Sequence, residues 1–154
     1  MYISTRGRYA VRALLDIALS DNGTPVSLRA ISERQNLPIS YLEQIFNRLK
    51  RVGMVQSVRG VNGGYHLGRI PDEITVGSII KTMEGPIRLS KCDEPPSKRP
   101  ACIGLDDCVA RIMWKTLEGK IDVLLEGISI GQLVKDSKEM EKRKAVNKYE
   151  ESIS

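Results

Sequence analysis

The spacing of apolar residues in the first half of this 154-residue chain constrains its fold more than any other feature. Apolar residues recur every three or four positions in three segments, which is the spacing of one face of an α-helix. The first segment runs from Thr5 to about Ser20, the second begins after Ser27, and the third runs from near Ser40 to about Val52. Asn36-Leu37-Pro38 lies between the last two, and such residues break helices. The pattern predicts three helices, with a tight turn before the third.

Two short strands are expected next, from Met54 to Arg59 and from Tyr65 to Arg69. The residues between them, 60–64, include three glycines and suit the turn of a β-hairpin. Helix, short helix, tight turn, helix and hairpin, in this order, predict a winged helix-turn-helix. One more helix, from Thr75 to about Met83, completes a domain over residues 1–84. The predicted fold class is therefore mainly α with a small β-hairpin.

The second half of the chain divides into a loop, a long helix and a tail. Residues 85–105 hold four prolines and are expected to form an irregular, cysteine-containing loop. Asp106 or Asp107 is expected to open a long helix with an apolar stripe, made of Ala110, Met113 or Trp114, Leu117, Ile121, Leu124 and Ile128. Such a stripe needs a partner surface, so residues 106–134, which end in a turn begun by a capping box at 129–132, are predicted to form a dimerisation helix and a following turn. Residues 135–154 are predicted to form a charged flexible tail.

The charge is distributed unevenly along the chain. Residues 1–70 carry ten lysines and arginines against four acidic residues, a net +6, while the remainder carries fourteen against fifteen, a net −1. A concentrated positive charge favours binding to a polyanion, because it neutralises phosphates and releases counterions. The chain has no long apolar run and no apolar leader, so we expect a cytoplasmic protein without a membrane partner.

The N-terminal turn of the third helix is where a winged helix-turn-helix presents side chains to base edges in the major groove. Ser40, Tyr41, Glu43 and Gln44 occupy this turn. Glutamine can pair with adenine, glutamate can accept from the cytosine amino group, and hydroxyls can contact bases or phosphates. Glu43 has an alternative role, because Ser40 and Glu43 have the spacing of a capping box.

Several cations are candidates for contacts with DNA. Arg59 sits at the tip of the hairpin, from which a long cation can enter the narrow minor groove; we favour this role over the alternative of a solvated loop residue. Arg48 and Arg51 complement the C-terminal end of the third helix dipole and are also candidates for phosphate contacts. Thr5 and Arg6 start the first helix, whose amide groups can receive another phosphate.

The three cysteines, Cys92, Cys102 and Cys108, fall within 17 residues of each other. An odd number of clustered thiols in a chain without a secretion signal indicates metal or redox chemistry rather than a disulfide framework. The single histidine, His66, lies in the hairpin and is expected to be a surface strand residue. The sequence has no catalytic triad, phosphate-binding loop or paired acid–base site, so we do not expect an enzyme.

Several segments carry a family resemblance. Residues 4–10 (STRGRYA), 31–35 (ISERQ), 40–46 (SYLEQIF), 57–60 (SVRG) and 63–65 (GGY) closely resemble the IscR, NsrR and CymR family of bacterial winged-helix transcription regulators. The likeness continues to residues 130–133 and covers about residues 2–134.

The resemblance implies a homodimer, joined through the long helix, that binds partly palindromic double-stranded DNA. In the cluster-binding branches, three cysteines before that helix hold an iron–sulfur cluster, and Cys92, Cys102 and Cys108 lie in the matching region. We therefore expect a cluster on these cysteines, of the two-iron two-sulfur type, that switches DNA binding.

The cysteine region departs from the family pattern at two points. Nine residues separate Cys92 from Cys102, where the usual spacing is five, and Arg111 stands where the IscR-like branch has a ligating histidine. The fourth ligand is therefore unidentified; Glu94, Asp106, Asp107 or the other subunit could supply it. The alternatives are a regulator controlled by thiol oxidation or by a partner protein, and a protein-interaction module that binds no DNA.

Overall fold

The computed structural model describes residues 3–20, 22–98 and 108–153. Helices α1 (Thr5–Leu19), α2 (Leu28–Gln35) and α3 (Ile39–Arg51) precede a hairpin of β1 (Val55–Val58) and β2 (Gly64–Leu67). Helix α4 (Val76–Glu84) follows the short 3-10 turn η1 (Pro71–Glu73). We call residues 3–84 the head and the hairpin with its loop, residues 55–67, the wing. The predicted fold class, a mainly helical winged helix-turn-helix with one small hairpin, is confirmed.

Side-chain caps fix where the helices of the head begin. The hydroxyls of Ser4, Ser27 and Thr75 accept backbone N–H bonds from Gly7, Ala30 and Ser78 at the starts of α1, α2 and α4. Each such cap satisfies an N–H that the helix itself leaves without a partner. Helix α2 ends at Asn36, whose left-handed backbone (φ 51°) turns the chain toward α3.

The wing is a two-stranded antiparallel sheet in which Val55 pairs with Leu67 and Val58 with Gly64. The backbone groups of Val26 and Tyr65 bond reciprocally, at 2.9 and 2.8 Å, and this bridge joins the wing to the segment before α2. Gly64 permits this contact, because a Cβ there would lie 2.5 Å from the Val26 carbonyl oxygen.

One apolar core holds the head together. The apolar stripe of α3, made of Leu42, Ile45, Phe46 and Leu49, is fully buried and belongs to one cluster with residues of α1, α4 and the start of α6. The largest fully buried side chains are Phe46, Leu14, Ile31, Leu42, Ile45, Leu49, Ile74, Ile79, Ile130 and Val55. The exposed side of α3 and the wing are thus presented by a rigid support.

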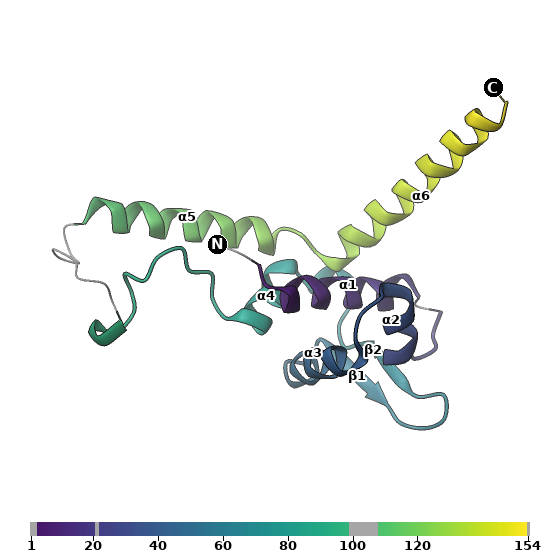
Figure 1. Cartoon of the computed structure of the whole chain (residues 1–154), viewed down its shortest axis with the longest axis horizontal. Helices are drawn as coiled ribbons and strands as arrows, with labels where there is room; N and C mark the ends of the chain where they lie inside the picture. The colour runs from purple at the N-terminus through teal and green to yellow at the C-terminus, as the bar shows by residue number, and fades with distance from the viewer. Residues whose placement is uncertain (1–2, 21, 99–107, 154) are drawn as a thin grey trace.

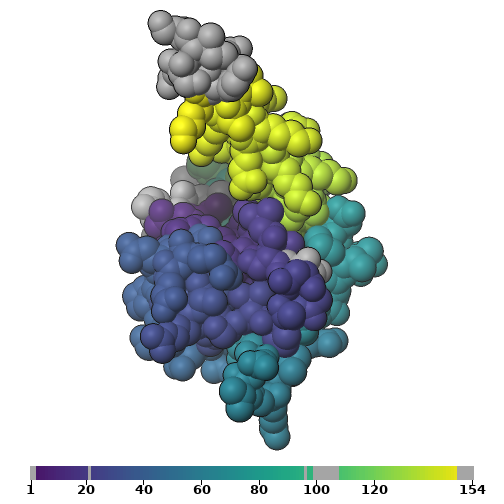
Figure 2. Space-filling view, turned by 90° about the vertical axis from the view of Figure 1, so that its right-hand side faces the viewer, coloured from purple at the N-terminus to yellow at the C-terminus, as the bar shows by residue number. Residues whose placement is uncertain are grey.

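Two long helices extend from the head (Figure 1). Helix α5 (Val109–Glu126) runs from the cysteine region back to the head, where α6 (Ile130–Ile153) begins. Helix α6 projects beyond the head on the side opposite the wing (Figure 2). Among the described residues, no helix is long and apolar enough to cross a membrane.

The C-terminal segment differs from the prediction. Residues 135–153 continue α6 as a helix, where the sequence predicted a turn followed by a flexible tail. Ser129 does cap this helix by accepting the Gln132 N–H at 3.0 Å, but the Gln132 side chain bonds to Asp136 instead of returning to close a capping box. Polar side chains four residues apart support a helix that lacks an apolar core face.

Candidate DNA interface and cysteine site

The N-terminal turn of α3 presents the predicted base-reading side chains. Ser40, Glu43 and Gln44 are exposed, while Tyr41 is half-buried with its ring 5.7 Å from that of Tyr9, edge to face. The capping role considered for Glu43 is wrong, because α3 begins at Ile39 after Pro38 and has no side-chain cap. The Glu43 carboxylate is therefore presented on the surface of the helix.

An ion pair between a buried carboxylate and a partly exposed arginine, which sequence reasoning missed, joins α1 to α2. Asp16, only 5% exposed, accepts from Arg34 Nη2 at 2.6 Å and from Gln35 Nε2 at 2.9 Å. Arg12 donates in turn to the Gln35 backbone carbonyl at 2.6 Å. The hydrogen bond with Asp16 raises the pKa of the Arg34 guanidinium. This network fixes α2, and with it the turn that leads into α3.

The predicted DNA-contacting cations lie in different environments. Arg59 is exposed directly after β1 at the tip of the wing, and Arg51 is exposed at the end of α3. Arg48 donates to the Met83 carbonyl at 3.0 Å, so it has a structural role at the end of α4, and its contact with phosphate stays a prediction. The α3 helix and the wing lie on the side of the head away from α5 (Figure 1).

At the start of α1, Thr5 and Arg6 are half-buried. Ser4 donates its backbone N–H and its hydroxyl to Glu84 at 2.9 and 2.7 Å, and this carboxylate joins the start of α1 to the end of α4. Arg8, which the sequence analysis did not single out, is exposed one turn further along.

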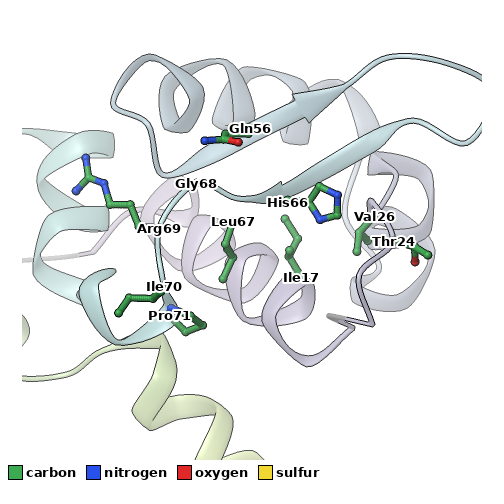
Figure 3. A pocket seen from close by; sticks show the side chains of 10 residues that line it. All are labelled: Ile17, Thr24, Val26, Gln56, His66, Leu67, Gly68, Arg69, Ile70 and Pro71. Carbon is green, nitrogen blue, oxygen red and sulfur yellow. The ribbon is translucent and has the colours of Figure 1, made fainter.

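Behind the wing lies an open hollow of about 530 Å³ (Figure 3). Its polar side chains do not converge, because Arg69 points away from His66 and donates to the Val52 carbonyl at 2.7 Å. His66 is a half-buried residue of β2, paired across the sheet with Gln56. The hollow therefore lacks a cluster of groups that could hold a ligand.

The cysteine region is described in part. Cys92 and Cys108 are free thiols, both half-exposed, and Cys108 occupies the N-cap position of α5. Cys102, Asp106 and Asp107 lie outside the described residues, so the expected helix start at an aspartate is not tested, and the described part of α5 begins at Val109. Within the described ranges, no three histidine, cysteine or acidic residues gather as a metal site.

Ion pairs attach the segment around Cys92 to α5. Arg111 Nη2 lies 3.0 Å from Asp93 Oδ1, and Lys115 pairs with the other carboxylate oxygen. These two partners, Lys115 more than Arg111, lower the pKa of Asp93. One turn further along α5, Glu118 is 8% exposed and accepts the Leu89 N–H at 2.7 Å.

A second polar cluster joins the other end of α5 to the head. Glu126 accepts from the Thr75 hydroxyl and from Lys81, whose Nζ lies 2.9 Å from Glu126 Oε1. Lys81 also pairs with Asp122 at 2.8 Å. Helix α4 approaches α5 closely at Gly77, where a Cβ would lie 2.9 Å from the Glu126 nitrogen. We call this cluster the joint.

Helix α5 exposes a wide apolar surface. The predicted stripe is exposed at Met113, Trp114, Leu117, Leu124 and Ile128, of which Leu124 is 68% exposed. Val109, Ile112 and Val123 extend it, with Val109 at 78% exposure, and the sequence analysis did not place them in the stripe. Exposed apolar side chains gathered along one helix are typical of an interaction site.

Comparison with known proteins agrees with this architecture. Residues 3–136 match the Rrf2 family, described as iron-dependent transcriptional regulators. The regulator IscR of Aliivibrio salmonicida is 43% identical over 137 residues, which are 89% of this chain and 79% of that protein.

Two solved structures are also similar. IscR of T. potens has a TM-score of 0.74 at 36% identity and covers 91% of this chain and 90% of its own. CymR, described as the global cysteine regulator of B. subtilis, has a TM-score of 0.72 at 34% identity, and the match covers 88% of this chain and 97% of the CymR chain. Together with the exposed α3 and the wing, these matches show that the chain belongs to the Rrf2 family and is a DNA-binding transcription regulator, not an enzyme.

Proposed function

We propose that this regulator acts as a homodimer whose DNA affinity is switched by an iron–sulfur cluster on Cys92, Cys102 and Cys108. The observation that carries the proposal is the construction of α5. The free thiol of Cys108 caps its N-terminal end, and Asp93, the neighbour of the free thiol Cys92, pairs with its residues Arg111 and Lys115. Apolar side chains cover the exposed face of α5, and the joint binds its C-terminal end to the head.

The dimer follows from the apolar face of α5. Leu117 and Leu124 lie two turns apart on this face, with Met113 one turn before them, and all three are exposed, at 38%, 68% and 45%. A second copy of α5 covers this surface if the two helices pack about a two-fold axis, because such an interface joins the same patch of both subunits. Two heads related in this way match the two halves of a partly palindromic operator.

Each head reads DNA with α3 and the wing. Glu43 and Gln44, with Ser40 and Tyr41, face the major groove, and Arg59 enters the adjacent minor groove. Arg51, Arg48, Thr5 and Arg6 complete the set of phosphate contacts. The net +6 of residues 1–70 supplies the general attraction to the phosphate backbone.

The chemistry of the donors fits an iron–sulfur cluster. Thiolates are the usual protein ligands of such clusters, and both described cysteines are free and half-exposed. Cys108 stands at the N-cap position of α5, so its sulfur is placed at the start of a long helix. When bound, a two-iron two-sulfur cluster supplies a group that is sensitive to oxidation and to iron supply. The description of the family as iron-dependent supports this choice.

Helix α5 can carry the signal to the DNA-binding surface. Its 18 residues span about 27 Å at 1.5 Å per residue, with the cysteines at one end and the joint at the other. A change in the conformation of the cysteine loop alters how the two α5 helices pack against each other. The joint transfers that movement to the heads and changes their spacing, and DNA affinity is sensitive to that spacing.

The second candidate is a thiol switch without a cluster. The accessibility of Cys92 and Cys108 favours it, because thiol oxidation requires exposed sulfur atoms. A similar solved structure, that of Staphylococcus aureus CymR, is described as an oxidized form, which supports this candidate.

Purification without oxygen separates the two candidates. The cluster proposal requires a coloured protein with visible absorption bands and with iron and sulfide in equal amounts. Replacing any one cysteine by alanine should remove the colour, whereas Arg111→Ala should keep it, because arginine is not an iron ligand. Colourless, iron-free protein would refute the cluster, and a coloured Cys92→Ala variant would show that Cys92 is not a ligand.

A further inference from the structure

The inference concerns how the segment that carries Cys92 is held against α5, whose N-cap residue is Cys108. Three side chains on one face of α5, Arg111, Lys115 and Glu118, contact the segment at residues 89–93. Successive members are four and three residues apart, so they form a continuous row along the helix. The row binds two points of the segment, the Leu89 N–H and the Asp93 carboxylate.

The order of these contacts sets the direction of the segment. Leu89 lies beside Glu118, and Asp93 lies beside Lys115 and Arg111, so the chain from 89 to 93 runs toward the N-terminal end of α5. Arg111 is only three residues from Cys108, a rise of about 4.5 Å along the helix. Asp93 directly follows Cys92, so its ion pairs keep this cysteine near the end of α5 that carries Cys108.

We propose that Asp93 is a positioning residue for the cysteine site, and that Arg111 and Lys115 are the clamp that holds it. Position 111, where the IscR-like branch has a ligating histidine, then serves the site through an ion pair. The link to an iron–sulfur cluster rests on the proposed function, but the clamp itself operates in the metal-free protein.

The clamp is tested first without metal. In a Cys102→Ser background, Cys92 and Cys108 are the remaining thiols, and a short bifunctional thiol reagent joins them when they are close. Products that keep the mass of one subunit, identified by peptide mapping, report the intramolecular reaction. We expect Asp93→Asn to lower its rate by about threefold to tenfold, because losing a tether lowers the effective concentration of one thiol near the other.

Three further variants control this result. Asp122→Asn is the matched control, because Asp122 pairs with a lysine at the opposite end of α5 and should leave the rate unchanged. Asp93→Glu keeps the charge and should retain most of the rate. The double variant Arg111→Ala, Lys115→Ala should cross-link as slowly as Asp93→Asn, and adding Asp93→Asn to it should not lower the cross-linking rate further. Circular dichroism checks that every variant is folded.

The loaded protein gives an independent readout. With all three cysteines present, a chelator should remove iron from Asp93→Asn about threefold to tenfold faster than from wild type and from Asp122→Asn. If Asp93→Asn cross-links at the wild-type rate, the clamp is refuted, whether or not a cluster is present. If cross-linking slows in a protein that binds no iron, the clamp stands and the cluster proposal fails.

Discussion

The ion pair between Asp16 and Arg34 gives the sharpest quantitative test of how the head is built. Asp16→Asn keeps the shape of the side chain but removes its charge, and it places an amide donor against the guanidinium donors of Arg34. Charge-assisted hydrogen bonds contribute about 1.5–3 kcal/mol each, and breaking a fully buried ion pair costs about 3–5 kcal/mol. The Arg34 side chain is 45% exposed, so water can solvate it once its partner is lost. We therefore expect Asp16→Asn to lower the unfolding free energy by about 2 kcal/mol, within the range for charge-assisted hydrogen bonds and below that for a fully buried ion pair.

The assay is urea unfolding at one fixed protein concentration, because the proposed dimer would make the unfolding free energy depend on concentration. The midpoint should fall while the slope stays constant. Glu33→Gln is the matched control: it breaks an ion pair with Arg29 whose side chains are 67% and 82% exposed, and such a pair contributes only about 0.3–0.5 kcal/mol.

Two results would refute the reasoning about Asp16. One is a loss for Asp16→Asn no larger than that for Glu33→Gln. The other is additivity with Arg34→Met, since two residues that stabilise the fold through each other must show a coupling energy when both are replaced.

Three further predictions test the dimer, the wing and the joint. Leu117→Glu should give monomers in sedimentation, because it places a charge in the apolar face of α5. Val61→Glu on the exposed wing loop is the control and should stay dimeric. A dimeric Leu117→Glu variant would place the interface elsewhere. Arg59→Ala should weaken specific DNA binding by about 1–3 kcal/mol in fluorescence anisotropy, while Lys142→Ala on α6 should not; equal affinities would exclude Arg59 from the groove. The hydrogen bond from Thr75, and then that from Lys81, lowers the pKa of Glu126. The stabilisation by Glu126 is therefore present above the unfolded-state pKa of about 4.3 and is lost as pH falls through the lower folded-state pKa. The unfolding free energy should consequently fall less steeply with decreasing pH in Glu126→Gln, and an unchanged pH dependence would show that the joint adds no stability.

Local signals in the sequence were sufficient to predict most of the head. The hydroxyls of Ser27 and Thr75 precede helical apolar spacing, and both cap their helices. The glycines of residues 60–64 placed the wing correctly. The start of α3 was predicted to within one residue, but the capping box from Ser40 to Glu43 was wrong, because Pro38 occupies the N-cap position and the helix begins at Ile39.

Longer-range features could not be predicted in this way. Asp16 and Arg34 are 18 residues apart, as are Asp93 and Arg111, and no local pattern pairs residues across such a separation. Helix α6 was missed for a different reason. Residues such as Glu139 and Arg143 stand four apart with opposite charges and favour a helix through surface pairs, which a search for an apolar face does not detect.

The two polar clusters on α5 together determine what kind of movement can connect the cysteines to DNA. At one end, Arg111 and Lys115 hold the cysteine segment through ion pairs near the surface, which are weak enough to rearrange. At the other end, Gly77 brings α4 against the backbone of α5, and Glu126 bonds to Thr75 and Lys81, so bending there would break several contacts at once. The contact between Asp93 and α5 can therefore rearrange at low cost, whereas the joint transmits displacement rather than absorbing it. We infer that a signal at the cysteines reaches α3 as a rigid movement of α5 and its head relative to the partner subunit, and that the structure within each head stays unchanged.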